Sequence, residues 1–456
     1  MNDSMNESAK HTKENIENIN DIEIKNEKIP TYYIIYTLIF AIVVFVVCTF
    51  IKKKMKTNVK KKREKSHQTI NSIEEELITI NNGKQSKEEL ESDISPKEEP
   101  KIGLNNIGAT CYMNATLQCL SHTILLTNYF LSSKGQKVIY SGINKLSKSY
   151  LEVIKNLWIK KSNRNSYSPT KFKKIISEMD PLFQGIAAND SKDLVNFIIQ
   201  QLHIELNKSK NNIDNIGFNQ NINQYDEQAM FNYFIEDYKR INCSIISDIF
   251  YSIIETITEC QQCKLRNQMN GIFSPFQLYN FQTINFIIFP LEEIRKTKSR
   301  IYNLNFNEIN INDCFDFNEK EEMMDGDNKM WCNYCKQNTP SKYKTRIYSS
   351  PQYFILILNR GRGNVYNVKL NFQEIIDIGR YVQCKNGQSL TYKLYAIVTH
   401  LGPSSMSGHF IAFCKSPIDN KWYKFNDSIV ELIGNFYNDV HEFGTPYILF
   451  YERQNL

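Results

Sequence analysis

The sequence lacks the features that mark several classes of protein. It has no internal repeat of fixed period, which excludes a solenoid or propeller built from repeated units. No apolar stretch lies close to Met1, so we expect no cleavable signal peptide. The formal net charge is only +6 over 456 residues, so charge alone does not indicate nucleic-acid binding. The eleven cysteines are odd in number and scattered, unlike those of a disulfide-stapled secreted domain.

The composition that is present supports a large folded domain. Hydrophobic residues make up 41% of the chain and aromatic residues 12%, enough for a substantial core. In the first half after residue 101, apolar spacing from Met113 to Ile124 predicts a helix over 113–124. In the second half, short runs rich in Tyr, Phe and Ile predict strands at 353–358, 394–400, 409–415 and 446–452. We therefore expect an α+β fold.

The first hundred residues have a different character. Residues 1–31 are polar, with too few apolar side chains to offset the entropy of ordering, and are predicted to be a disordered tail. Residues 32–51, "YYIIYTLIFAIVVFVVCTFI", carry no charge and are long enough to cross a bilayer as one helix. Residues 52–100 turn from basic to acidic and are predicted to be a flexible linker.

The basic residues directly after the apolar run predict its orientation. The stretch "KKKMKTNVKKKREK" holds nine basic residues, and the positive-inside rule places such a stretch in the cytosol. We therefore expect a single-pass membrane protein whose globular domain, 101–453, is cytosolic. The outer mitochondrial membrane and the endoplasmic reticulum suit such an anchor about equally well. A buried core helix is the alternative interpretation of residues 32–51.

A candidate nucleophile stands at the predicted start of the first helix of the domain. In "NNIGATCYMNATLQCL", Cys111 follows the small residues Gly108 and Ala109. A thiolate is a far better nucleophile than a thiol, and the partial positive charge of a helix N-terminus favours the anion. The alternative is a structural cysteine, which is the commoner role for a single Cys at a helix start.

A base and its orienting partner can be found near the other end of the domain. His409, in "SMSGHFIAF", follows a glycine that permits close backbone approach and precedes an apolar strand. Asn426 and Asp427 lie on the next strand-like segment, "WYKFNDSIV". Neighbouring antiparallel strands can bring one of these side chains against the imidazole, which completes a Cys–His–Asn or Cys–His–Asp arrangement. The alternative is a histidine with no role in chemistry.

Two C-x-x-C pairs indicate a metal site. The four thiols are Cys260, Cys263, Cys332 and Cys335. Their spacing is that of a four-thiolate zinc ribbon, in which a closed tetrahedral zinc ion is structural. We expect one structural zinc ion and no cofactor for catalysis. The alternative is that these cysteines are reduced and unbound.

Long segments of the domain resemble the ubiquitin-specific proteases, a family of papain-like cysteine peptidases. "GLNNIGATCYMNATLQCL" (103–120) resembles the cysteine box of that family, and 392–430 resembles its histidine box. "NDSKDLVNFIIQQLH" (189–203) is similar to the Gln-Asp-Ala-x-Glu-Phe helix of the family, and "PYILFYER" resembles its last strand. The resemblance extends over 101–453 and implies a thumb–palm–fingers catalytic domain with zinc-ribbon fingers.

The resemblance assigns roles to individual residues. It implies that Cys111 is the nucleophile, His409 the general base and Asn426 the third member of the triad. Asp427 matches an acidic residue that assists, and Asn106 matches a side chain that stabilises the oxyanion. Removing one such oxyanion donor raises a barrier by roughly 3–4 kcal/mol.

The resemblance also implies a site for the arginine-containing tail of ubiquitin. Asp190 and Asp193 supply two carboxylates suited to guanidinium groups. This segment departs from the family pattern, because Asn189 replaces a Gln and Leu194 stands where Phe is common. The alternative interpretation of the two aspartates is a solvated helix start.

The sequence as a whole predicts a membrane-anchored, thiol-dependent ubiquitin C-terminal hydrolase. The expected partners are ubiquitin, ubiquitinated proteins and a lipid bilayer, with no nucleic acid. One alternative is a protease of another ubiquitin-like modifier. A non-catalytic ubiquitin-binding scaffold is a second, and the presence of Cys111, His409 and Asn426 together argues against it. A zinc-ribbon nucleic-acid binder is a third, but the strongest basic cluster lies beside the apolar run instead.

Overall fold

The computed structural model describes residues 101–159, 165–209, 225–263, 277–360, 368–385, 389–404, 407–441 and 443–454. They belong to one compact unit of the chain, residues 74–456. The tail, transmembrane helix and linker expected at 1–31, 32–51 and 52–100 lie outside the described residues. Within the described part of the chain, none of the helices combines the length and apolar character that crossing a membrane requires.

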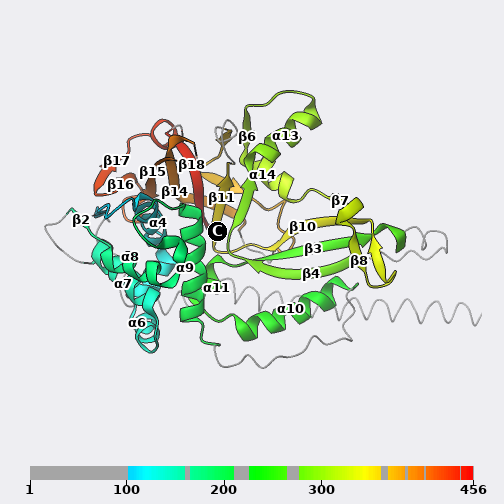
Figure 1. The fold of residues 1–456 in the computed structure, drawn as a ribbon, viewed down its shortest axis with the longest axis horizontal. Coiled ribbons are helices and arrows are strands. Elements are labelled where there is room, and N and C mark those ends of the chain that lie inside the picture. Colours follow the sequence, from blue (N-terminus) through cyan, green and yellow to red (C-terminus); the bar gives the residue numbers. More distant parts are fainter. Residues whose placement is uncertain are drawn as a thin grey trace, which may run out of the picture. The chain divides into compact units, whose positions relative to one another are not determined.

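A lobe of helices forms one side of the fold (Figure 1). Its α-helices are α4 (Cys111–Ser121), α5 (Ile124–Leu131), α6 (Ser133–Tyr140), α7 (Lys145–Trp158), α8 (Thr170–Met179), α9 (Ser191–Leu206) and α11 (Ile245–Phe250). A 3₁₀ turn, η2 (Pro181–Phe183), and a short parallel pair, β1 (Gly103–Leu104) and β2 (Ser166–Tyr167), complete it. Leu194, Ile198 and Leu202 are fully buried, as the three-and-four spacing of α9 predicts.

The central sheet is buried on both faces. Its strand order is β17–β16–β15–β14–β18–β11–β5, with β13 paired to β14. The strands are β5 (Ile287–Pro290), β11 (Tyr353–Asn359), β13 (Ile375–Asp377), β14 (Thr391–Ser404), β15 (Ser407–Lys415), β16 (Trp422–Asn426), β17 (Ile429–Leu432) and β18 (Thr445–Arg453). Along β18, Ile448 and Phe450 pack with the helical lobe, whereas Leu449 and Tyr451 pack into a second core. The four strands predicted from the sequence are β11, β14, β15 and β18, so that prediction is confirmed.

The second core lies on the face of the sheet opposite the helical lobe. Its elements are α13 (Leu291–Tyr302), β6 (Glu308–Asn310), α14 (Ile311–Asn318), β12 (Lys369–Asn371) and a π-helical turn, η5 (Tyr437–His441). Among its fully buried side chains are Leu291, Phe289 and Phe315. The mixed α and β architecture agrees with the expected fold class.

A finger-like sheet extends away from the central sheet (Figure 1). Its strand order is β4–β3–β10–β7, and α10 (Glu227–Ile241) packs against β4. The strands are β3 (Ser252–Cys260), β4 (Gln277–Ile284), β7 (Glu322–Met324) and β10 (Ser341–Ser349). Near its tip lie a 3₁₀ turn, η3 (Gly326–Asn328), and a short hairpin of β8 (Met330–Cys332) and β9 (Gln337–Thr339). Glu255, fully buried in β3, forms an ion pair with Arg346 of β10.

One predicted helix is wrong at its end. The apolar spacing predicts a helix over 113–124, but α4 ends at Ser121 and Ile124 begins α5. The Thr123 N–H bonds to the Leu120 carbonyl at 3.2 Å, which tightens the last turn into 3₁₀ geometry. The Thr127 hydroxyl then donates to the Ser121 carbonyl, so the chain bends between the two helices.

A buried carboxylate joins two helices of the lobe. Asn144, at the N-cap of α7, makes no side-chain capping bond to that helix. Glu205 of α9 instead accepts the N–H groups of Leu146 at 3.0 Å and Ser147 at 2.7 Å. The first N–H groups of a helix lack intrahelical partners, and negative charge there also complements the helix dipole. Glu205 therefore fixes α7 against α9.

Replacing Glu205 should destabilise the fold in a graded way. We expect Glu205→Ala to lower the free energy of unfolding by about 3 kcal/mol, because two buried N–H groups lose a charged acceptor. Glu205→Gln keeps one oxygen and should cost about 1 kcal/mol. Urea denaturation followed by circular dichroism measures both changes, with exposed Glu178→Ala as the control. Equal and negligible losses would contradict the capping role.

Candidate active site

Cys111 is the first residue of α4, and only 6% of it is exposed. The loop before Cys111 folds around the side chain of Asn106. Asn106 Oδ1 accepts hydrogen bonds from the N–H groups of Gly108 at 3.2 Å and Thr110 at 3.1 Å. Gly108 and Ala109 both have positive φ angles, which a tight loop of this kind requires. The thiol therefore lies at a helix N-terminus in a preformed loop, as the sequence predicts.

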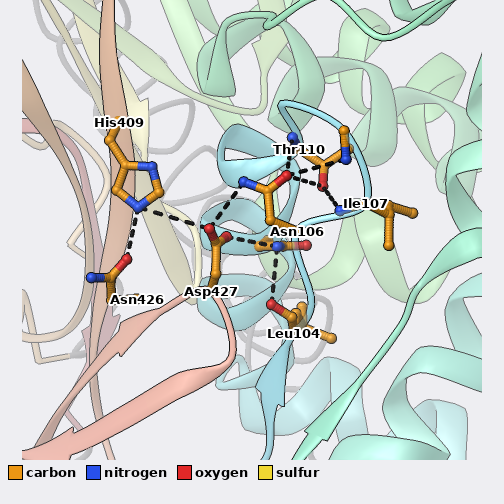
Figure 2. Close-up of polar contacts among 9 residues, drawn as sticks. Leu104, Asn106, Ile107, Thr110, His409, Asn426 and Asp427 are labelled. Atoms are coloured by element: carbon orange, nitrogen blue, oxygen red, sulfur yellow. Dashed lines mark hydrogen bonds and ion pairs between the residues drawn. The ribbon is translucent and has the colours of Figure 1, made fainter.

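His409 and Asn426 lie on adjacent antiparallel strands, β15 and β16. His409 Nε2 donates to Asn426 Oδ1 at 2.7 Å, as Figure 2 shows. A Cβ atom at Gly408 would lie 2.4 Å from the ring of His400, so only glycine fits before His409. Gly408 thus allows the close backbone approach that the sequence predicts before His409.

The environment of His409 favours its charged form. A hydrogen bond with the Cys111 side chain raises the pKa of His409 most strongly, and burial opposes it. The hydrogen bond to Asn426 and the negative charges of Cys111 and Asp427 raise the pKa further, to about 9. The imidazole therefore carries a proton near neutral pH, beside a thiol that it can stabilise as the thiolate.

Asp427 connects three parts of the site (Figure 2). Its Oδ2 accepts from Asn106 Nδ2 at 3.0 Å and lies 3.9 Å from His409 Nε2. Its Oδ1 accepts from Asn114 Nδ2 at 2.8 Å, and its backbone carbonyl accepts from the Leu104 N–H at 2.8 Å. The φ angle of Asp427 is 50°, a left-handed conformation that is rare outside glycine and that often marks functional sites.

Asn106, for which the resemblance implies an oxyanion role, lies in the loop that leads to Cys111. Its amide carries two N–H donors, and the hydrogen bond to Asp427 uses one of them. Its carbonyl oxygen is held by the loop that leads to Cys111. The amide of Asn106 is thus held through both its nitrogen and its oxygen, while the oxyanion role itself stays a prediction.

The two aspartates of the predicted tail site lie at the start of α9. Asp190 is the N-cap residue, and its Oδ1 accepts the Lys192 N–H at 2.9 Å. Its Oδ2 accepts from the Tyr447 hydroxyl at 2.6 Å and lies 3.0 Å from Lys192 Nζ. Burial, and then the charge of Asp190, raises the pKa of Asp193. Asp190 therefore has a structural role as well, and the binding of a substrate arginine stays a prediction.

Two polar residues of the site were missed by the sequence analysis. Asn114, only 2% exposed, holds Asp427, and Tyr447 of β18 holds Asp190. Asn114 follows Cys111 by three residues and so lies on the same face of α4. A polar side chain three residues after the candidate nucleophile is the signal that could have found it. Tyr447 gives no comparable local signal, because its partner is 257 positions away.

The four cysteines of the C-x-x-C pairs meet at the tip of the finger sheet. Their sulfurs all lie within 4.8 Å of one another. The Sγ–Sγ distances are 4.0 Å for Cys260–Cys335, 3.6 Å for Cys263–Cys332 and 3.3 Å for Cys263–Cys335. Zinc–sulfur bonds of 2.3 Å in a tetrahedron give sulfur separations of about 3.8 Å. The N–H groups of Cys263 and Cys335 also point to Cys260 and Cys332 Sγ at 3.5 Å, so the cluster fits a zinc ion.

Comparisons with known proteins agree with this geometry. The chain is 28% identical to ubiquitin carboxyl-terminal hydrolase Usp2 of Drosophila melanogaster over 79% of this chain and 36% of the relative. It is 28% identical to human ubiquitin carboxyl-terminal hydrolase 2, over 77% of this chain and 54% of the relative. The chain thus spans between a third and about half of the length of these curated relatives.

A solved structure shares the fold. The SAGA DUB module containing Ubp8, bound to monoubiquitin, superposes with a TM-score of 0.58 at 19% identity, covering 82% of this chain and 74% of that chain. The model of the family described as ubiquitin carboxyl-terminal hydrolase matches residues 102–451. The fold, the Cys111–His409–Asn426 geometry and this match together lead to one conclusion: the chain belongs to the ubiquitin carboxyl-terminal hydrolase family.

Proposed function

We propose that the protein is a deubiquitinating thiol protease that hydrolyses the bond after the C-terminal glycine of ubiquitin in conjugates. The observation that carries this proposal is the position of His409, which is hydrogen-bonded to the Cys111 side chain on one side and to Asn426 on the other. The names of the curated relatives, and the monoubiquitin bound to the solved relative, support ubiquitin as the modifier. A complete set of catalytic groups disfavours a purely binding scaffold.

The arrangement supports acylation followed by hydrolysis. The Cys111 thiolate attacks the carbonyl carbon of the terminal glycine, and the Asn106 amide donates to the oxygen on which negative charge develops. The His409 imidazolium gives its proton to the leaving amine as the carbon–nitrogen bond breaks, which leaves a thioester. His409, now neutral, takes a proton from water that attacks the thioester, and the thiolate is released. Asn426 orients the imidazole throughout.

The finger sheet and the start of α9 are the proposed ubiquitin-binding parts. Asp190 and Asp193 would accept the guanidinium groups of the ubiquitin tail. Cys260, Cys263, Cys332 and Cys335 would hold one zinc ion that braces the finger sheet. Such an ion, bound by four thiolates, has no open coordination position and serves the fold, not the reaction.

The proposed enzyme is anchored in a membrane by residues 32–51. The uncharged run and the nine basic residues that follow it support this proposal. The topology places the catalytic domain in the cytosol, where ubiquitin conjugates and reduced thiols are available. The outer mitochondrial membrane and the endoplasmic reticulum are both compatible with such an anchor.

The central test uses Cys111. We expect Cys111→Ala to abolish cleavage of a ubiquitin C-terminal amide while ubiquitin binding remains measurable, because the nucleophile alone is lost. A ubiquitin probe with a C-terminal electrophile should label the parent protein and the exposed-thiol control Cys243→Ala. Labelling by probes of other ubiquitin-like modifiers, but not by the ubiquitin probe, would identify the alternative substrate class. Unchanged turnover of Cys111→Ala would rule out the mechanism.

The raised pKa of His409 predicts a pH dependence. His409 is protonated below about pH 9 and loses its proton as the pH rises through that value, so kcat/KM should fall above about pH 9. Asn426→Ala removes a hydrogen bond that raises this pKa, so the alkaline limb should move to lower pH and turnover should slow. His409→Ala should lower turnover roughly 10²–10⁴-fold. An alkaline limb that does not move in Asn426→Ala, with exposed Asn438→Ala as the control, contradicts this assignment.

Removing one zinc ligand should destabilise the protein. We expect about one zinc ion per chain, and Cys332→Ser should lower both zinc content and melting temperature because structural zinc contributes directly to folding. Elemental analysis and thermal unfolding measure these quantities. Cys384→Ser, which changes a cysteine outside the cluster, serves as the control. Pure parent protein without zinc would remove the proposal.

The anchor predicts both extraction behaviour and topology. The full chain should resist carbonate extraction, and a chain lacking residues 1–51 should be soluble and active. Protease protection on intact organelles, with antibodies to each end, should find the catalytic domain accessible. A domain that is protected until detergent is added would reverse the topology.

A further inference from the structure

The turn between α6 and α7 presents two large apolar side chains to solvent. Tyr140, the last residue of α6, is 58% exposed, and Ile143, in the turn itself, is 88% exposed. Scattered exposed apolar residues are ordinary in soluble proteins. These two are three residues apart on one turn at the end of the helical lobe, so they form a single apolar tip.

The apolar tip is held in shape by its own hydrogen bonds. Asn144, only 4% exposed, donates from Nδ2 to the carbonyls of Val138 at 3.1 Å and Ile139 at 3.3 Å. Lys148 Nζ donates to the Gly142 carbonyl at 2.8 Å and lies 5.9 Å from the centre of the Tyr140 ring. The exposed conformation of the tip therefore does not need to be ordered by a partner, which lowers the entropic cost of binding one.

The two helices that flank the tip are strongly basic. Between residues 133 and 158 the chain has five lysines and one carboxylate, Glu152. Glu152 is itself paired with Lys171 of α8 at 2.8 Å. The lysines are Lys134, Lys137, Lys145, Lys148 and Lys155. The apolar tip thus lies beside several lysines, of which Lys137 and Lys145 are exposed.

We infer that the apolar tip and these lysines form a docking surface for an anionic lipid bilayer. Lysine ammonium groups meet anionic headgroups while their stems lie along apolar surface, and tyrosine rings favour the membrane interface. A nucleic acid would match the lysines but would leave Ile143 without a partner. The inference rests on the proposed anchor at 32–51, which makes the contact intramolecular and lets a weak surface suffice. The 49 residues from Lys52 to Pro100 can span at most about 170 Å, which sets an upper limit on the distance between the domain and the proposed anchor.

The helix that leads into the tip lies apart from the strands that carry the catalytic groups. In Figure 1 the helix α6 lies at the bottom of the view, whereas the central-sheet strands β15 and β16, which carry His409 and Asn426, lie near the top. A lobe resting on the bilayer through the apolar tip therefore leaves the catalytic centre open to substrates on the cytosolic side.

Quenching of tryptophan fluorescence by brominated lipid tests this surface. The full chain is reconstituted into vesicles of brominated phosphatidylcholine, either alone or mixed with phosphatidylserine. The tryptophan added in Ile143→Trp should be quenched more strongly when phosphatidylserine is present, and less so as salt is raised. Ile375→Trp, at a position 59% exposed on β13, is the matched control and should not respond. Equal quenching in both lipid compositions, or none beyond the control, overturns the inference.

Reversing the charge of two lysines beside the tip provides a second test of the docking surface. In the Ile143→Trp background, Lys137→Glu with Lys145→Glu should weaken the contact at least about 25-fold, because each lysine near an anionic surface contributes about fivefold. Lys320→Glu with Lys421→Glu changes two exposed lysines elsewhere and should leave quenching intact. Retained quenching in the first pair would also overturn the inference. Carbonate washing of the same vesicles reports failure of the anchor separately, and cleavage of a soluble ubiquitin amide should be unchanged in every variant.

Discussion

The catalytic geometry depends on where one carboxylate is held. Asp427 receives amide donors from Asn106 and Asn114, which are 321 and 313 positions away in the chain. Through these bonds the Asp427 side chain holds the loop before Cys111 and the first turn of α4. The charge of Asp427 also raises the pKa of His409. Its left-handed backbone conformation costs roughly 1–2 kcal/mol, and the Leu104 N–H that bonds its carbonyl helps to hold it. The hydrogen bonds of Asp427 therefore join the two ends of the domain at the catalytic site.

Much of this arrangement could be predicted from the sequence because its signals are local. The strands β14 and β15 contain the apolar runs 394–400 and 409–415, and Cys111, His409 and Asn426 lie in long segments with a family resemblance. The end of α4 could not be predicted from the sequence, because the apolar spacing continues through Ile124 whereas the hydrogen-bonded helix ends at Ser121. The capping of α7 by Glu205 is equally hidden, since its partners are 58 and 59 positions away. Sequence patterns report which faces are buried, but not which distant polar groups meet there.

The surroundings of the cysteines suit two different roles, metal binding at the finger tip and nucleophilic attack at Cys111. Each cysteine of the finger tip lies within reach of three other sulfurs, and the sulfurs of Cys260 and Cys332 also receive N–H groups from their own turns, which suits thiolates that share a metal ion. Cys111 lies instead at a helix N-terminus beside the imidazole of His409, whose pKa is raised, and this arrangement suits a nucleophile. Cysteines with these two roles need not come in pairs, so their number can be odd and their positions scattered. The cysteines of a disulfide-rich protein are instead paired.

The position of β18 has a consequence for how the molecule is made. This strand is the last of the central sheet to be synthesised, yet it lies in the middle, between β14 and β11. On the ribosome, the earlier strands therefore emerge with a gap that cannot close until Thr445–Arg453 has been added. Cys111 is translated more than three hundred residues before that point, without its base or its carboxylate partner. The nucleophile thus has neither the base nor the carboxylate of the finished site in the chain until His409 and Asp427 have been translated.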